Sequence, residues 1–410
     1  MTRSEVRLSL RTTRLSTDAS FSIIEHLPES ASAFLRNKEG LVGWGEAARL
    51  TAKGPQRMQQ LAAAWRELVS QTDVADEVGV PGSGLVAFGS FAFADDSEDE
   101  SVLIVPKILL GSRDGVCWLT QVEESTSENF WDEPQHYREN SAITLREGLQ
   151  SAEGFMSAVS TAISNIENSR VKKVVIARDL VASTPTEFDI RTALHRFATK
   201  YPTCWTYSVD GLFGASPELL VRVSHKQVSA RVLAGTAGRG TDPGVDFAIS
   251  TALAASSKNI AEHQFAVQSL VDELQKFCSQ VDADSEPFSL QLPNLWHLAS
   301  DVHAVLKDDA SALDLAAVLH PTAAVAGTPT ESAQQLIAEL EPFDRGRYAG
   351  PVGWIGADGD GEWAIALRGA LLQDNQITAY AGCGIVAESD PVAELEETEL
   401  KFKPIREALA

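Results

Sequence analysis

Residues 204–240, CWTYSVDGLFGASPELLVRVSHKQVSARVLAGTAGRG, constrain the fold more than any other stretch of the chain. β-Branched and aromatic residues are interrupted by turn-forming Asp-Gly and Ser-Pro pairs, a pattern typical of short strands joined by tight turns. Strands connected so closely can only pair antiparallel, since a parallel pair needs a long crossover. This stretch therefore predicts antiparallel sheet.

Other stretches predict the remaining elements. Apolar residues at helical spacing predict helices at 55–71, 152–168, 191–201 and 256–277. Strands are predicted at 40–50, 83–93 and 171–182, with two more around the turn QDNQ inside 362–386. A last helix begins near Pro391, because Asp390 can cap it and proline suits the first helical position.

The balance of these elements predicts the fold class. Strands outnumber what simple strand–helix alternation requires, which favours an α/β or α+β fold with large, mostly antiparallel sheets and helices outside. The polar, irregular stretch at 125–140 is a candidate linker. Because no clean break separates two independent domains, we expect a single domain over residues 1–410.

The charge of the chain excludes some partners. A net charge of −23 argues against nucleic acid, whose binding depends on Lys and Arg neutralising phosphates. It argues equally against an anionic membrane surface. A small anion is still possible, because one cleft can be locally positive or hold a metal ion.

The cysteines and the apolar runs indicate the compartment. Four scattered cysteines form no CxxC pair, so a zinc site or disulfide framework is not expected. The N-terminus lacks the apolar core of a signal peptide, and no run of about 18 apolar residues could span a membrane. A cytoplasmic protein is the expectation, with a monomer as the default assembly.

Two residues are candidates for acid–base chemistry. Lys173 stands at the entrance of a buried strand, where a lysine is usually a solvated edge residue but can also be a partly desolvated base. Glu218 follows Ser-Pro and precedes two leucines. It could be a turn residue, or a carboxyl whose pKa is raised by apolar company and which acts as an acid.

Several glutamates are candidates for metal binding. Glu394, Glu397 and Lys401 share one helix face, which suits either a surface ion pair or a Mg²⁺ site. Glu396 and Glu399 are expected to be solvated. Glu262 falls nearly opposite the apolar stripe of its predicted helix, so periodicity alone places it in solvent.

The remaining candidates could contact an anion. Arg368 ends an apolar run and could clamp a carboxylate or simply reach water. His297 lies in an apolar context, where a structural histidine is the more common finding. Gly382 and Gly384 suggest backbone amides presented to an anion, although neither belongs to a P-loop or a Rossmann fingerprint.

Taken together, these residues lie in motifs that resemble a known family. The motifs KVVIAR, GASPELL, LAGTAGRG, KNIAEHQFAV, LWHL, LHPTAAVAGTP, EPFDRGRYAGPVGW, ALRGALL and AGCGIVAESDPVAELEETELK occur in the order seen in chorismate-utilising enzymes. The strong blocks span 150–405, and 1–145 is the more variable part. Within the family the chain is most similar to the isochorismate synthases. The resemblance implies one large domain of two stacked sheets with helices outside.

The resemblance also implies a ligand set. Mg²⁺ would be bound by Glu262 and Glu397, with Glu394 nearby, which overturns the solvated expectation for Glu262. The implied substrate, chorismate, is a dianion, so a chain of charge −23 needs local cations to bind it. Arg368 and Lys401, with the amides around Gly382 and Gly384, would hold the enolpyruvyl carboxylate.

The implied chemistry adds water at ring C2 and removes the C4 hydroxyl. Lys173 would activate the water and Glu218 would protonate the departing hydroxyl. His297 would hydrogen-bond the substrate, and Thr236 would line the pocket. No amidotransferase partner is expected.

Single positions distinguish branches of the family. Lys173 disfavours anthranilate synthases, and Ala234 disfavours aminodeoxychorismate synthases, which carry a lysine there. Ala324 favours isochorismate over salicylate synthases, whereas Tyr348 resembles the salicylate enzymes. Salicylate synthesis therefore stays an alternative, as does a catalytically silent homologue, which the intact Lys173 and Glu218 argue against. Whether isochorismate would supply menaquinone or siderophore synthesis stays open.

Overall fold

The computed structural model describes residues 7–17, 21–123, 140–185 and 188–410, with only the backbone described at 258, 261 and 262. The predicted linker at 125–140 lies outside the described residues except for Asn140. The described strands form two sheets that are mostly antiparallel, as the pattern of residues 204–240 indicated. The predicted fold class is confirmed.

The first sheet contains thirteen of the described strands. They are β1 (Ser9–Leu15), β2 (Ser32–Arg36), β3 (Glu39–Trp44), β5 (Asp73–Asp76), β8 (Ile108–Arg113), β9 (Val116–Val122), β10 (Arg146–Glu147), β11 (Lys173–Ser183), β12 (Trp205–Val209), β13 (Leu212–Ser216), β19 (Gly327–Thr328), β22 (Gly369–Gln373) and β23 (Gln376–Ile385). Their order is β10-β11-β23-β22-β13-β12-β2-β3-β8-β9-β1-β5, with β19 paired to β11.

The second sheet contains ten of the described strands. They are β4 (Ala48–Ala52), β6 (Val86–Ser90), β7 (Ser101–Val105), β14 (Leu219–Ser224), β15 (Gln227–Gly238), β16 (Cys278–Ala283), β17 (Phe288–Gln291), β18 (Leu295–Leu306), β20 (Pro351–Gly356) and β21 (Gly361–Ile365). Their order is β16-β18-β15-β14-β21-β20-β6-β7-β4, with β17 paired to β18.

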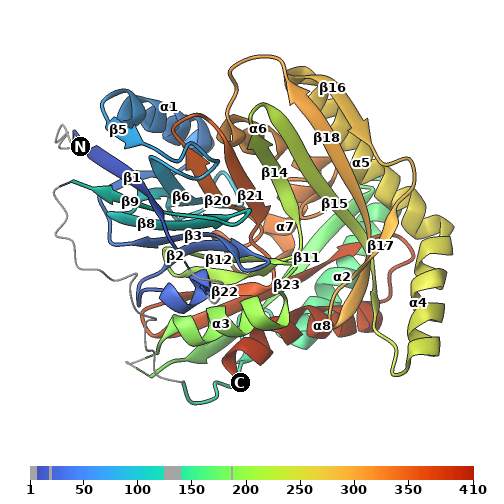
Figure 1. Ribbon diagram of the computed structural model, residues 1–410. Coiled ribbons are helices and arrows are strands. Elements are labelled where there is room, and N and C mark those ends of the chain that lie inside the picture. Colours follow the sequence, from blue (N-terminus) through green and yellow to red (C-terminus); the bar gives the residue numbers. More distant parts are fainter. Residues whose placement is uncertain (1–6, 18–20, 124–139, 186–187) are drawn as a thin grey trace.

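Helices cover the outside of these sheets (Figure 1). They are α1 (Arg57–Ser70), α2 (Ala152–Glu167), α3 (Ile190–Lys200), α4 (Pro243–Ala255), α5 (Ser257–Phe277), α6 (Ala312–Leu319), α7 (Thr330–Leu340) and α8 (Pro391–Leu409), with a 3-10 turn at Ile23–His26. α1, α5 and α6 pack on the second sheet, and α3 and α8 on the first. The predicted helices at 55–71, 152–168, 191–201, 256–277 and from Pro391 are confirmed.

The two sheets pack against each other through a shared apolar layer. Phe34 and Trp205 of the first sheet lie in one cluster with Phe88 and Trp354 of the second. All four side chains are at least 97 % buried. Burying such aromatic area contributes about 25 cal/mol per Å² removed from water, so this layer fixes the two sheets relative to one another.

The chain passes from one sheet to the other several times, and two of these passages lie within residues 204–240 and 362–386. Residues 204–240 supply β12 and β13 to the first sheet and β14 and β15 to the second, with Pro217 and Glu218 between them. The predicted strand before the QDNQ turn is likewise divided, because β21 ends at Ile365 in the second sheet and β22 begins at Gly369 in the first. The expectation of two strands in 362–386 was therefore wrong.

The second passage has a clear backbone signature. Arg368 adopts a φ of 54°, a left-handed conformation that L-residues rarely adopt. Such a residue breaks the extended strand and lets the chain change sheets. This change of sheet could not be predicted from the sequence, because a left-handed arginine has no local sequence signal.

The start of α8 was predicted correctly, because it depends on a local hydrogen bond between a side chain and the backbone. The Asp390 carboxylate accepts from the amides of Val392 and Ala393, so α8 begins where the sequence predicted. All four cysteines are buried and free. Among the described residues, no helix is both long and apolar enough to cross a membrane.

Candidate active site

One cavity of about 260 Å³ brings together the predicted site residues. It is lined by Lys173, Glu218, Thr236, His297, Ala324, Tyr348, Arg368, Gly382, Gly384, Glu394, Glu397 and Lys401. Glu262 lies on α5, and its side chain is outside the described residues. Glu218 and Arg368 each lie at a passage of the chain between the sheets, so the cavity lies where the two sheets join.

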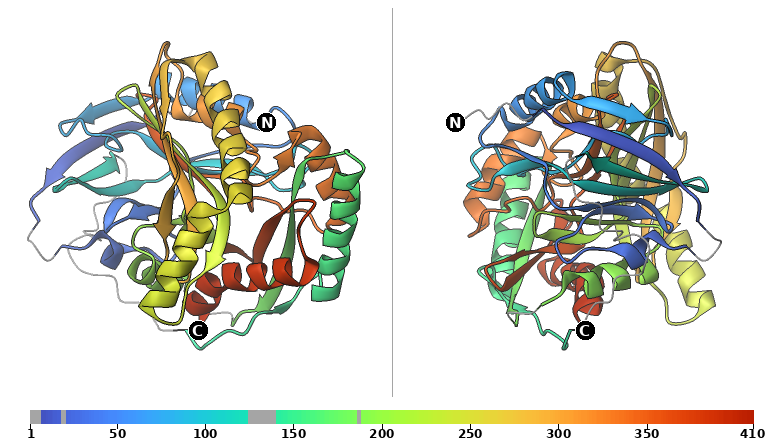
Figure 2. Two further views of the ribbon diagram at one scale, coloured as in Figure 1. Left: turned by 90° about the vertical axis from the view of Figure 1, so that its right-hand side faces the viewer. Right: turned by 60° about the vertical axis from the view of Figure 1, so that its left-hand side comes forward.

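Two walls of the cavity are separate in sequence. In Figure 2, left, β15 and β18 lie together with α4 and α5 near the centre, and α8 with β11 and β23 lies to the lower right of this group. Thr236 and His297 come from β15 and β18, whereas Lys173 begins β11 and Lys401 belongs to α8. The site therefore depends on tertiary packing of these walls.

Glu218 is a buried carboxyl where the chain passes from β13 of the first sheet to β14 of the second. Only 6 % of its surface is exposed, and its amide donates to Ser216 Oγ at 3.2 Å. Burial raises the pKa of Glu218 to about 8, although the charges of Lys173, Arg368 and Lys401 act to lower it. At neutral pH this carboxyl is mostly protonated, as an acid catalyst must be.

Lys173 is half-buried at the first position of β11. Its backbone pairs with Thr328 of β19, which fixes the start of the strand against the loop that carries Ala324. Its charge acts on the Glu218 carboxyl. An amine and a protonated carboxyl thus share one cavity.

Arg368 is held by a histidine. Its Nη2 donates to Nε2 of His297 at 3.1 Å, and Nδ1 of His297 lies 3.2 Å from both Thr236 Oγ1 and the Gly235 carbonyl. These partners assign the proton to Nδ1. Burial, followed by the charges of Arg368 and Lys401, lowers the pKa of His297 well below its usual value, so the ring is neutral.

Arg368 also has one unsatisfied hydrogen-bond donor. Its Nη1 is buried and has no hydrogen-bond partner among the described residues. A buried cationic donor without an acceptor is costly, so the free energy of the site improves when an anionic group binds there. A substrate carboxylate is the natural acceptor for a guanidinium.

Lys401 joins α8 to β23. Its Nζ lies 2.6 Å from Glu397 Oε1 and donates to the Gly382 carbonyl at 2.7 Å. Burial alone would raise the pKa of Glu397, but the attraction of Lys401 outweighs it and lowers that pKa. The pair is therefore ionised, and the predicted shared helix face is confirmed by this contact.

Two of the predicted carboxylates are close enough to share a cation. Ligand atoms of Glu394, Glu397 and Cys383 lie within 4.8 Å of one another, and Ser389 Oγ donates to Glu394 Oε1 at 2.7 Å. Burial raises the pKa of Cys383 well above its usual value, so the thiol stays protonated. The carboxylate oxygens fit a hard cation such as Mg²⁺, whereas a neutral thiol does not.

Gly382 and Gly384 present backbone groups to the cavity. Opposite them on β11, the amides of Ala177 and Val175 donate away from β23, to Glu341 Oε1 and the Ala326 carbonyl. In an antiparallel ladder such residues form non-hydrogen-bonded pairs, so both glycines point their amides away from β11. The described pairing of β23 with β22 ends at Ala379, which leaves these groups facing the cavity.

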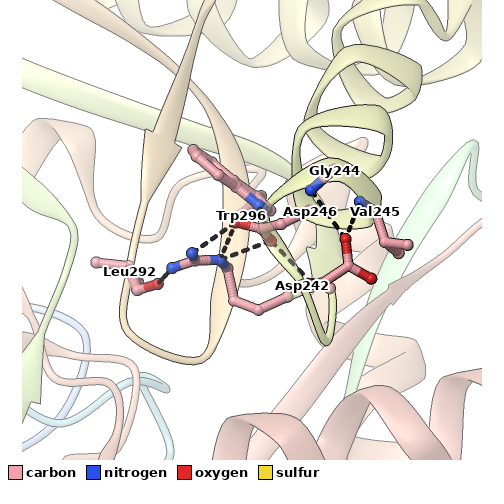
Figure 3. Close-up of polar contacts among 8 residues, drawn as sticks. Asp242, Gly244, Val245, Asp246, Leu292 and Trp296 are labelled. Carbon is pink, nitrogen blue, oxygen red and sulfur yellow. Dashed lines mark hydrogen bonds and ion pairs between the residues drawn. The ribbon is translucent and has the colours of Figure 1, made fainter.

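A polar cluster fixes the wall that carries His297 (Figure 3). Arg239 forms an ion pair with Asp246 at 2.5 Å and donates to the Leu292 carbonyl. Trp296 Nε1 donates to the same carboxylate at 2.9 Å, and Trp296 immediately precedes His297. The start of α4 is thus bound to β18 next to the site.

Sequence reasoning missed several residues of the cavity. Asn259, Ser389 and Tyr380 line it, as does Arg345. Arg345 binds Glu341 and donates to the Val175 and Val325 carbonyls, which fixes β11 to the loop before β19. Asn259 and Arg345 lie inside the motifs KNIAEHQFAV and EPFDRGRYAGPVGW, and only that membership could have indicated them.

Glu399 of α8 is exposed, as expected, and it also accepts from Arg178 Nη1 at 2.9 Å and from Arg406 Nη2 at 2.9 Å. Arg178 is only 3 % exposed on β11, so Glu399 supplies the charge partner of a buried guanidinium. Glu396 is exposed, as expected.

The comparisons with known proteins all indicate the same family. Residues 3–410 match the model of the family described as chorismate binding enzyme. The chain is 43 % identical over 251 residues to "Putative isochorismate synthase MenF" of Mycobacterium tuberculosis, covering 58 % of this chain and 67 % of that protein. It is 37 % identical over 265 residues to isochorismate synthase EntC of Escherichia coli, covering 63 % and 68 %.

A solved structure supports the fold. The menaquinone-specific isochorismate synthase MenF of Escherichia coli matches with a TM-score of 0.78 at 24 % identity. The match covers 98 % of this chain and 95 % of that one. At this identity the likeness concerns the arrangement of the sheets and helices.

Proposed function

The chain belongs to the chorismate-binding enzymes, and from this we propose that it is an Mg²⁺-dependent isochorismate synthase. The observation that carries the proposal is the pairing of Lys173 with Glu218 in one cavity. Burial keeps Glu218 mostly protonated at neutral pH, and Lys173 lines the same cavity as this carboxyl.

The reaction is an isomerisation with one water consumed and one released. Lys173, as the neutral amine, takes a proton from a water whose oxygen bonds to ring C2, and the ring double bonds shift. Glu218 gives its proton to the C4 hydroxyl, which departs as water. Atoms and charge balance, and the enzyme is left with a protonated Lys173 and an ionised Glu218.

Cations in the cavity suit a dianionic substrate. The unsatisfied Nη1 of Arg368, with the amides of Gly382 and Gly384, would hold one carboxylate. Lys401 is shared with Glu397 and adds positive charge to the same wall. The neutral His297 orients Arg368 and so acts on substrate binding through it.

Mg²⁺ would be held by Glu394 and Glu397, and by Glu262 as the family resemblance implies. When bound, it would neutralise a ring carboxylate of the substrate. Two close carboxylates, one hydrogen-bonded by Ser389, are a suitable oxygen donor set for this ion.

Salicylate synthesis is the second candidate, favoured by one observation. Tyr348 lines the cavity. A tyrosine at this position resembles the salicylate synthases of the family. Such an enzyme would form isochorismate and then eliminate pyruvate. Ala324, which also lines the cavity, favours the first candidate.

One assay separates these functions. Purified protein is incubated with chorismate and Mg²⁺, and products are separated by HPLC while salicylate fluorescence is recorded. Isochorismate without salicylate is expected, and chelation of Mg²⁺ with EDTA should abolish it. Salicylate with pyruvate would establish the second candidate, and unchanged chorismate would contradict both.

A further inference from the structure

A second cavity, of about 270 Å³, lies behind Glu218. Glu218 and Ala324 line both this cavity and the active site, so they form the wall between the two. At its other end the second cavity is lined by Ser269 of α5 and Val318 of α6, which are both exposed. The cavity therefore extends from the protein surface to the buried acid.

The inner part of this cavity is suited to water. Thr322 Oγ1 and His320 Nδ1 are both buried, and neither has a hydrogen-bond partner among the described residues. Both residues line the cavity. His320 donates from Nε2 to the Phe93 carbonyl, which leaves Nδ1 as an acceptor. Unsatisfied polar atoms in a cavity of this size are normally satisfied by ordered water.

We propose that this second cavity is a water passage that returns a proton to Glu218 and releases the water formed at C4. The inference rests on the proposed function. After each turnover Glu218 has lost a proton and Lys173 has gained one, so both must be reset before the next turnover. With substrate or product filling the active site, Glu218 can exchange a proton with solvent only from its other side.

The kinetic consequence differs from that of a damaged active site. Resetting Glu218 follows the chemical step, so a blocked passage slows kcat. The ratio kcat/KM reports substrate capture by enzyme that is already protonated, so it is unchanged. A distorted site would instead lower kcat/KM.

The test places a bulky side chain at the mouth of the passage. Ser269→Trp is compared with Gln275→Trp, an exposed position on the same helix that does not line the cavity. Initial rates of isochorismate formation are measured in H2O and D2O. We expect Ser269→Trp to lower kcat about tenfold, with kcat/KM within about twofold of wild type and a larger solvent isotope effect on kcat. Gln275→Trp should behave as wild type.

Thr322→Val provides an independent variant, since valine has the shape of threonine without the hydroxyl. Like Ser269→Trp, it should lower kcat and leave kcat/KM unchanged. Wild-type kcat in both variants, or a parallel fall of kcat/KM, would overturn the proposal while the proposed function stands. Failure of wild-type protein to form isochorismate would instead overturn the proposed function.

Discussion

Glu218 lies where the chain passes from β13 to β14 and Arg368 where it passes from β21 to β22, and backbone hydrogen bonds tie these two passages between the sheets together. Ile365 N donates to the Glu218 carbonyl at 3.1 Å, and Ala215 N donates to the Arg368 carbonyl at 3.4 Å. An acid and a cation are thus positioned by the fold's own crossings rather than by flexible loops. Rigid support of this kind keeps catalytic groups in register with the substrate.

Replacing the acid tests its role directly. Glu218→Gln keeps the shape but cannot donate a carboxylic proton, so kcat should fall by at least about a hundredfold. In the wild type, kcat/KM should decline above about pH 8, where Glu218 loses its proton. Initial rates of isochorismate formation across pH check both. A variant as active as wild type would remove Glu218 from the mechanism.

The same carboxyl links stability to pH. Burial raises the pKa of Glu218 from 4.5 unfolded to about 8 folded. Its contribution to stability is therefore full below pH 4.5 and is lost as pH rises through about 8. Relative to wild type, the free energy of unfolding of Glu218→Gln should increase between about pH 5 and about pH 9. Urea unfolding at both pH values measures it, and a constant difference would contradict the raised pKa.

The contact between His297 and Arg368 should affect substrate binding. His297→Leu removes the acceptor of Arg368 Nη2, and a hydrogen bond to a charged group contributes about 1.5–3 kcal/mol. We expect KM for chorismate to rise about tenfold or more, with a smaller change in kcat. His303→Leu, at an exposed position of the same strand, is the matched control. Equal KM values for the two variants would contradict the positioning role.

The α8 surface offers a stability comparison. Glu399→Ala leaves the buried Arg178 without its charge partner and should lower the free energy of unfolding by about 1–3 kcal/mol. Glu396→Ala, at an exposed position of the same helix, should change it by less than about 0.5 kcal/mol. Denaturant unfolding of the two variants measures this difference. Similar losses in the free energy of unfolding would mean that the contact of Glu399 with Arg178 contributes little.

Local signals predicted the elements well. Asp390 and Pro391 located the start of α8, because capping and proline geometry act within one turn. The passage of the chain between sheets at Arg368 could not be predicted, since it depends on which strands are available to pair. The pairing of Glu399 with Arg178 also escaped prediction, because those residues are 221 positions apart.

The site was predicted mainly from family motifs. Periodicity showed only that Glu394, Glu397 and Lys401 share a face, and the contact of Glu397 with Lys401 agrees. Residue type and spacing could not reveal that Lys173, on β11, and Glu218, between the sheets, face one cavity. Tertiary packing brings these two residues together, and in the sequence only the family resemblance indicated that they share a site.

The most direct test of the central claim follows the oxygen. Protein, chorismate and Mg²⁺ are incubated in water enriched in oxygen-18, and the isochorismate formed is analysed by mass spectrometry at early times. We predict one heavy oxygen in the product, bonded at C2, and no product from Lys173→Ala. Unlabelled isochorismate, or activity that survives in Lys173→Ala, would contradict the addition of a lysine-activated water.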